Sequence, residues 1–234
     1  MPAAIFDVDR TLLDGMSGYF FSAWLWKTRR MPHRGRLRTA RSLILYRLKL
    51  APETEMVEVG ATALAHLRVD EVARLAEQCV EEIIGPRVFS EAVKKIAEHN
   101  AAGDFTLLAS GSAQPVIEAL AKKVGAKGAV GTRPRLGKNG AYLPEVVLPL
   151  CYRDGKTELV ERMLATHGFR LEDAFIYSDN APDIPLMERT AHPFAVNPDA
   201  ALRAHAELRG WPILTWNTLL PGNPNATGTR WPLR

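Results

Sequence analysis

Short apolar runs that end in small or polar residues, separated by helical patterns, constrain the fold of this chain more than any other feature. The runs lie at residues 3–6, 105–109, 174–177 and 193–196, with a further short strand expected at 128–131. Such runs are typical of buried parallel strands. Helical periodicity is expected at about 89–102, 114–125, 155–167 and 198–209. Strands that alternate with helices predict an α/β fold, in which a parallel sheet lies between two layers of helices.

The alternation is interrupted after the first strand. Residues 15–87 contain helical patterns, for example at 35–50 and 69–84, but no convincing strand. We therefore expect an all-helical cap domain at 15–87, inserted into a core domain that consists of residues 1–14 and 88–216.

Turn-forming residues mark several boundaries. Gly103 and Gly125 stand where the C-caps of two predicted helices favour glycine. Asn139-Gly140 lies within the segment 132–150 and predicts a short hairpin with a type I′ turn. Residues 217–234 are rich in Pro, Gly and Asn, so we expect an irregular C-terminal tail.

The composition excludes several other classes of protein. Of the 234 residues, 47% are hydrophobic and 24% are charged, which disfavours disordered, collagen-like and coiled-coil chains. Cys79 and Cys151 lack metal-ligand spacing and are too few for a disulfide framework, so we expect free thiols in a reducing compartment. No signal peptide is visible, and the aromatic stretch 19–26 is too short to span a bilayer. These features predict a soluble, cytoplasmic protein, either a monomer or a homodimer.

The positive charge is concentrated in one block. The net charge is +4, yet the segment between Gly15 and Pro52 has no acidic residue, and the rest of the chain carries a net −5. The nine basic residues of this block are Lys27, Arg29, Arg30, Arg34, Arg36, Arg38, Arg41, Arg47 and Lys49. The block is either a solvated helix surface or a surface for an anionic partner. No nucleic-acid-binding motif accompanies it, so we expect no nucleic acid partner.

Aromatic residues precede the basic block, namely Tyr19, Phe20, Phe21, Trp24 and Trp26. Packing within the cap explains most of them. Two other interpretations stay open: recognition of a bulky or lipid-like phosphate, and weak contact of the cap with an anionic membrane surface.

Polar residues follow three of the predicted strands, at the edge where such sheets place their ligands. Asp7 and Asp9 end the first strand, Ser110 follows the second, and Asp179 follows the strand at 174–177. Two carboxylates two residues apart repel each other, and a divalent cation such as Mg²⁺ commonly holds such a pair.

Three groups of residues near this edge could take part in binding an anion or a metal ion. Ser110-Gly111 forms either a phosphate cradle at the start of a helix or an ordinary N-cap. Lys156, in the first turn of its predicted helix, lies where the helix dipole disfavours a cation, which indicates a nearby anion. Asp179 and Asp183 could supply one metal ligand and one residue that orients its neighbours.

The ordered set resembles the four motifs of the haloacid dehalogenase (HAD) superfamily. It consists of Asp7-x-Asp9-x-Thr11, Ser110, Lys156 and Ser178-Asp179-x-x-x-Asp183, within a resemblance that spans about residues 3–216. The chain looks closest to the phosphoserine-phosphatase-like branch, in which a helical cap lies between the first two motifs. The resemblance implies a Rossmann-like core and an Mg²⁺-dependent phosphatase that acts on a small-molecule phosphate ester.

The resemblance also implies a role for each motif residue. Asp7 would attack phosphorus to form an aspartyl-phosphate, and Asp9 would protonate the leaving alkoxide and later activate water. Ser110, Gly111 and Lys156 would bind the phosphoryl oxygens. The expected Mg²⁺ ligands are Asp7, the backbone carbonyl of Asp9, and Asp179. Thr11 would hold the loop, and Asp183 would orient Lys156 or a metal-bound water.

The substrate and the acceptor stay open at this point. The segment Asp14-Gly15-Met16-Ser17 lacks the glutamate with which phosphoserine phosphatases bind the substrate amine, and Pro182 replaces their usual Asn. An amino-alcohol phosphate (phosphoserine-like or histidinol phosphate) and a bulkier, lipid-like phosphate are both candidates. The alternatives are a phosphotransferase with the same aspartyl-phosphate and a non-catalytic phosphate-binding or receiver-like signalling module, although a receiver domain has about half this length and no cap.

Overall fold

A computed structural model of the chain describes residues 1–31, 41, 44–45 and 60–222. Its centre is strand β1 (Ala3–Asp7), which is buried along its whole length. The seven-stranded sheet has the order β4-β3-β2-β1-β5-β6-β7 and is parallel except at the β3–β4 pair. The other strands are β2 (Phe105–Ala113), β3 (Gly128–Leu136), β4 (Tyr142–Val147), β5 (Phe175–Ser178), β6 (His192–Val196) and β7 (Ile213–Leu214). The predicted α/β fold with a mostly parallel sheet is therefore confirmed.

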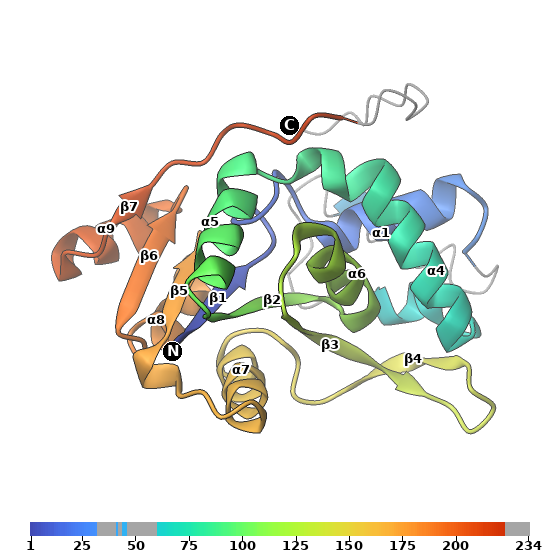
Figure 1. Cartoon of the computed structure of the whole chain (residues 1–234). Helices are drawn as coiled ribbons and strands as arrows, with labels where there is room; N and C mark the ends of the chain where they lie inside the picture. Colours follow the sequence, from blue (N-terminus) through green and yellow to red (C-terminus); the bar gives the residue numbers. More distant parts are fainter. Residues whose placement is uncertain (32–40, 42–43, 46–59, 223–234) are drawn as a thin grey trace.

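Helices cover both faces of the sheet because successive side chains of a buried strand point to opposite faces. Ala4 and Phe6 pack with α5 (Ser90–Ala101) and α6 (Gln114–Val124). Ala3 and Ile5 belong to the opposite cluster. That cluster includes α7 (Asp154–Thr166), α8 (Ile184–Met187) and α9 (Ala200–Arg209). Figure 1 shows α5 and α6 on one side of the sheet and α7 on the other, which gives three layers.

The described residues between β1 and α5 are mainly helical. They form α1 (Ser17–Lys27), a helical turn at 60–64, and α4 (Val69–Cys79), which continues as a π-helical turn (Val80–Ile84) and a 3₁₀ turn (Gly85–Arg87). The helix expected at 69–84 is thus present. Most of the one expected at 35–50 lies outside the described residues, and the cap boundaries at 15 and 87 stay a prediction.

The aromatic residues of α1 mainly pack inside the protein. Tyr19, Phe20, Phe21 and Trp24 are buried, whereas Trp26 is 42% exposed. The indole Nε1–H of Trp24 donates to Glu82, 2.9 Å away, and this bond ties α1 to the π-helical turn. Most of the basic block lies outside the described residues, so its contact with a membrane surface also stays a prediction.

The hairpin formed by β3 and β4 differs from the prediction in its turn. Gly140 has a φ of +74° and donates its N–H to the Gly137 carbonyl at 3.1 Å, but Asn139 has no positive φ. A type I′ turn requires positive φ at both central residues, so that prediction is wrong. A turn closed by the Gly140–Gly137 hydrogen bond and ending in the left-handed Gly140 connects the strands instead, and the Gly137 N–H donates to the Ala141 carbonyl at 2.8 Å.

Glycines end helices where the sequence indicates. Gly125, the C-cap of α6, has a φ of +75°, and Gly103, just after α5, has a φ of +89°. Only glycine adopts this left-handed conformation readily.

The first part of the tail is irregular but docked on the core. The Ser90 N–H donates to the Thr218 carbonyl at 2.7 Å, and the Leu220 N–H donates to the Val88 carbonyl at 2.8 Å. Strand β7, which the sequence analysis did not predict, precedes this segment and pairs with β6. Residues 223–234 lie outside the described part. Among the helices of the described residues, none combines the length and apolar character needed to cross a bilayer.

Candidate active site

Buried charges meet at the carboxyl end of β1. The ammonium group of Lys156, in the first turn of α7, lies 2.6 Å from Asp7 Oδ1 and 2.5 Å from Asp183 Oδ2. All three residues are buried. The Ser178 hydroxyl donates to the same oxygen of Asp183 at 2.6 Å. The structure therefore brings Asp7, Lys156 and Asp183 together, as expected, and Asp183 touches Lys156 directly.

Burial and the neighbouring charges set the protonation of these groups. Burial alone would lower the pKa of Lys156, but the attraction of Asp183 and Asp7 outweighs it and raises that pKa. Burial raises the pKa of Asp7 to about 7 despite the opposing attraction of Lys156. Burial and the charge of Asp7 raise the pKa of Asp179 to about 8. The Lys156 ammonium group is thus protonated. For Asp7 and Asp179, the nearby positive charges do not fully offset the effect of burial on the pKa.

Thr11 links the first and the last motif. Its buried hydroxyl lies 3.1 Å from Asp7 Oδ2 and 3.3 Å from Asp179 Oδ1. The loop that carries it folds back on the end of β1, because the Leu12 N–H donates to the Val8 carbonyl at 2.9 Å. Thr11 therefore lies between Asp7 and Asp179, and its role in holding the loop stays a prediction.

Asp9 points away from Lys156 and toward serines. Its Oδ2 accepts from the Ser110 hydroxyl at 2.7 Å, and its Oδ1 accepts from the N–H and the hydroxyl of Ser17 at 2.5 and 2.6 Å. The sequence predicted Ser110 at the start of a helix, but it lies within the end of β2. The register of β2 with β3 shifts there, between Ala109 and Ala113. The N-cap of α6 is Ala113, so Ser110 is not an N-cap residue.

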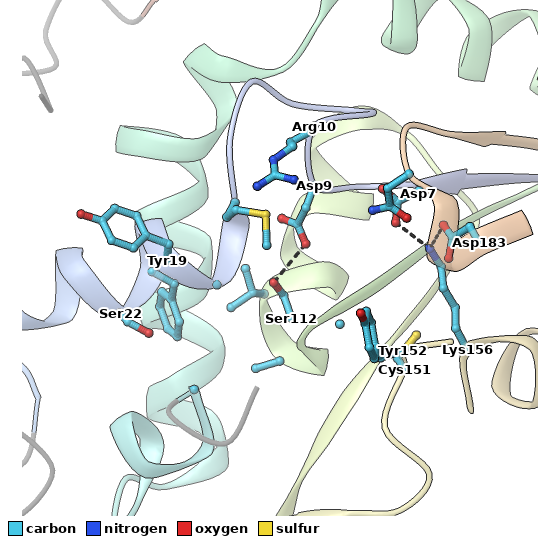
Figure 2. Close-up of a pocket in the computed structure, with 18 residues that line it drawn as sticks. Asp7, Asp9, Arg10, Tyr19, Ser22, Ser112, Cys151, Tyr152, Lys156 and Asp183 are labelled. Atoms are coloured by element: carbon cyan, nitrogen blue, oxygen red, sulfur yellow. Dashed lines mark hydrogen bonds and ion pairs between the residues drawn. The ribbon is translucent and has the colours of Figure 1, made fainter. Parts of the chain in front are cut away.

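A pocket of about 920 Å³, counting its open mouth, lies above these groups. Figure 2 shows Asp7, Asp9 and Lys156 on one side and Tyr19 and Ser22 of α1 on the other. Its further lining residues include Arg10, Met16, Phe21, Gly111, Ser112, Val116, Cys151, Tyr152 and Asn180. Polar, charge-bearing residues at one end and apolar side chains at the other suit a small molecule with an anionic head.

The donor set fits a divalent cation. The carboxyl groups of Asp7, Asp179 and Asp183 are buried close together, and both the Lys156 ammonium group and the Arg10 guanidinium group act on them. Burial still raises the pKa values of Asp7 and Asp179, which a bound cation would offset. Within the described residues, no three acidic, histidine or cysteine side chains form a ready-made metal site. Mg²⁺ often takes only one or two carboxylates and fills its remaining positions with carbonyl oxygens, waters or substrate oxygens.

Sequence reasoning missed three polar residues of the site. Ser17 and Ser112 contact Asp9, and Arg10 lines the pocket next to it. Ser112 directly follows Ser110-Gly111, so its place at the strand end was a usable signal. Ser17 carried none, because only the fold brings the start of α1 back to Asp9.

The sequence of this chain is similar to a known protein family and to several named proteins. The profile of the haloacid dehalogenase-like hydrolases matches residues 4–188. A Streptomyces azureus protein named for inhibition of morphological differentiation is 33% identical over 218 residues, 92% of this chain and 78% of its own length. A probable phosphatase of Mycobacterium tuberculosis is 31% identical over 218 residues, with coverage of 92% and 75%. A histidinol-phosphatase of Neisseria meningitidis is 30% identical over 156 residues, 65% of this chain and 70% of its own length.

Solved structures support the same fold. A protein of unknown function from Bordetella pertussis Tohama I has a TM-score of 0.80 and 29% identity, and the match covers 91% of this chain and 97% of that one. A substrate-bound phosphoserine phosphatase has a TM-score of 0.60 and 17% identity, with coverage of 91% and 92%. At this identity, the second similarity concerns the fold alone.

Proposed function

The chain belongs to the haloacid dehalogenase-like hydrolase family, and from this we propose that it is a phosphatase that hydrolyses small-molecule phosphomonoesters through an aspartyl-phosphate on Asp7. The observation that carries the proposal is the contact of Lys156 with both Asp7 and Asp183, at 2.6 and 2.5 Å, on the floor of a pocket. A buried carboxylate beside a fixed ammonium group suits attack on phosphorus, because a carboxylate and a phosphate dianion otherwise repel each other.

We assign a residue to each step. An Asp7 oxygen forms a bond to phosphorus while the bond from phosphorus to the ester oxygen breaks, and Lys156 stabilises the negative charge on the phosphoryl group. Asp9 protonates the departing alkoxide and then removes a proton from the water that hydrolyses the aspartyl-phosphate. The Ser110 hydroxyl and the Gly111 N–H would bind the phosphoryl oxygens, with Asp183 keeping Lys156 in position.

The proposed cofactor is Mg²⁺. Asp7, Asp179 and the backbone carbonyl of Asp9 would hold it, and it supplies positive charge that offsets the repulsion between nucleophile and phosphate. The raised pKa values of Asp7 and Asp179, about 7 and about 8, support a cation between them.

The substrate is proposed only as a class. The relative named histidinol-phosphatase supports an amino-alcohol phosphate. Met16, Phe21 and Val116 in the pocket wall favour a bulkier apolar ester. A panel of amino-alcohol, sugar, nucleotide and lipid phosphates separates these classes.

The first experiment is the hydrolysis of p-nitrophenyl phosphate with and without Mg²⁺. We expect Mg²⁺-dependent activity that Asp7→Asn lowers by more than about a hundredfold, since the variant loses the nucleophile but keeps its size. Circular dichroism and the melting temperature check that the variant is folded. An Asp7→Asn protein that is folded and keeps more than a few per cent of the activity would contradict the assignment.

The acceptor is tested separately. If water accepts the phosphoryl group, added alcohols leave inorganic phosphate as the product. A phosphotransferase would form new phosphate esters with the same alcohols, which ³¹P NMR detects.

A further inference from the structure

The first residue of helix α1 donates two hydrogen bonds to one oxygen of Asp9. Ser17, the first residue of α1, places its N–H 2.5 Å and its hydroxyl 2.6 Å from Asp9 Oδ1. Ser17 is completely buried, whereas Asp9 is partly buried and lines the pocket. The other oxygen, Oδ2, instead lies 2.7 Å from the hydroxyl of Ser110. The two oxygens of Asp9 are therefore distinguished: one is fixed by α1, and the other faces the proposed phosphoryl cradle.

We propose that Ser17 is a positioning residue that orients Asp9 so that Oδ2 exchanges the proton with the ester oxygen. The inference rests on the proposed function, because it assigns a partner to the acid of that reaction. The Ser17 N–H and hydroxyl both donate to Oδ1, and Oδ1 stays an acceptor whether or not Oδ2 carries the proton, so Ser17 can hold Asp9 both before and after the proton has moved.

A second contact fixes Ser17 itself. The hydroxyl of Ser112, at the end of β2, lies 2.7 Å from the Ser17 hydroxyl and 3.4 Å from Asp9 Oδ2. Gly18 allows this approach, because a Cβ at that position would lie only 2.9 Å from the Ser112 hydroxyl oxygen. The first turn of α1 is thus locked to the sheet as well as to Asp9.

The contact between Ser17 and Asp9 links the proposed acid to the helix that forms part of the pocket wall. Tyr19 and Ser22 of the same helix line the pocket, opposite Asp9 (Figure 2). A shift of α1 that changes the space for the substrate therefore also moves the partner of Asp9.

The dependence on the leaving group tests this role. When an alkyl ester is cleaved, the bonding electron pair stays on the leaving oxygen, which takes its proton from Asp9. p-Nitrophenolate leaves without a proton. General acid catalysis contributes about 10²–10⁴-fold, so a misplaced acid loses a sizeable part of that factor for the alkyl ester only.

We would measure kcat/KM for a primary alkyl phosphate and for p-nitrophenyl phosphate in the wild type, Ser17→Ala and Thr28→Ala. Thr28 is a matched control because its hydroxyl bonds to the Trp24 carbonyl at the other end of α1. We expect Ser17→Ala to lower the alkyl-to-aryl ratio by at least about tenfold and Thr28→Ala to leave it unchanged. In an Asp9→Asn background, Ser17→Ala should cause no further change, because the two residues act as one unit.

The outcomes separate this inference from the proposed function. A wild type that hydrolyses neither ester overturns the proposed phosphatase and this inference with it. An active wild type in which Ser17→Ala lowers both esters equally, or neither, overturns only the role of Ser17. If Ser17→Ala does not fold, Ser112→Ala takes its place, and an unchanged ratio in that variant contradicts the inference.

Discussion

Lys156 stays charged inside the protein because Asp7 and Asp183 lie on either side of its ammonium group. Removing one partner of such a buried set leaves an uncompensated charge, which is far more costly than losing a surface ion pair. The sequence indicated this only indirectly, through a lysine at an unfavourable position in its helix. The distances show that the nearby anions are carboxylates of the protein itself.

Cys151 also lines the pocket but is not a competing nucleophile. Burial raises its pKa to about 12, and burial raises the pKa of Cys79 well above its ordinary value. Since the thiolate is the nucleophilic form, these raised pKa values and the burial of both thiols disfavour reaction in the folded protein.

We therefore expect Ellman's reagent at pH 8 to react with neither cysteine of the native protein at an appreciable rate, at least about a hundredfold more slowly than with the unfolded chain. In denaturant, both should react, which serves as the control. A native thiol that reacts as fast as in the unfolded chain would show that its site opens to solvent.

At the scale of elements, a buried polar network fastens α5 to the sheet. His99 of α5 lies 2.8 Å from Asp104, just before β2, and 2.9 Å from the hydroxyl of Tyr177 in β5. Tyr177 in turn stacks on Phe6 of β1, with ring centroids 4.6 Å apart. No sequence motif indicates this network, because Tyr177 lies 78 residues from His99 and only the folded sheet brings the two together.

We expect His99→Ala to destabilise the protein by about 2–5 kcal/mol, because it opens a cavity and leaves the buried Asp104 and the Tyr177 hydroxyl without their partner. Urea unfolding measures the loss. Tyr177→Phe should cost less, since it removes only a hydroxyl group. None of these residues lines the pocket, so kcat of the folded variants should stay within about twofold of the wild type. A large loss of kcat without loss of stability would contradict this structural role.

At the scale of the molecule, the cluster of carboxyl groups links stability to pH and to metal. Asp7 and Asp179 have pKa values of about 7 and about 8 in the folded protein, against 3.8 for an ordinary aspartate. Between these values the folded state binds more protons than the unfolded state, so stability falls as the pH rises. This contribution is fully present below about pH 4 and is lost as the pH passes through 7 and 8.

We accordingly expect the melting temperature of the metal-free protein to fall between about pH 5 and pH 9, by about 2–4 °C for each kcal/mol lost. Asp179→Asn should flatten this dependence, because it removes one of the two carboxyl groups. Mg²⁺ should raise the melting temperature of the wild type more at pH 8 than at pH 6, since it competes with protons for the same oxygens. Scanning fluorimetry checks both effects, and a melting temperature that rises with pH equally in wild type and variant would contradict them.

The sequence by itself determined the alternation of strands and helices and the edge of the sheet where the motif residues meet. These features follow from local periodicity and from the rule that parallel strands end at one edge. Only the tertiary structure decided the position of Ser17 against Asp9, the His99 network and the docking of residues 217–222 on α5, because none of these contacts follows from a local sequence pattern. The hairpin turn shows the same limit on a small scale, because Asn-Gly is compatible with more than one turn and only the structure shows that Gly140 alone of the two has a positive φ.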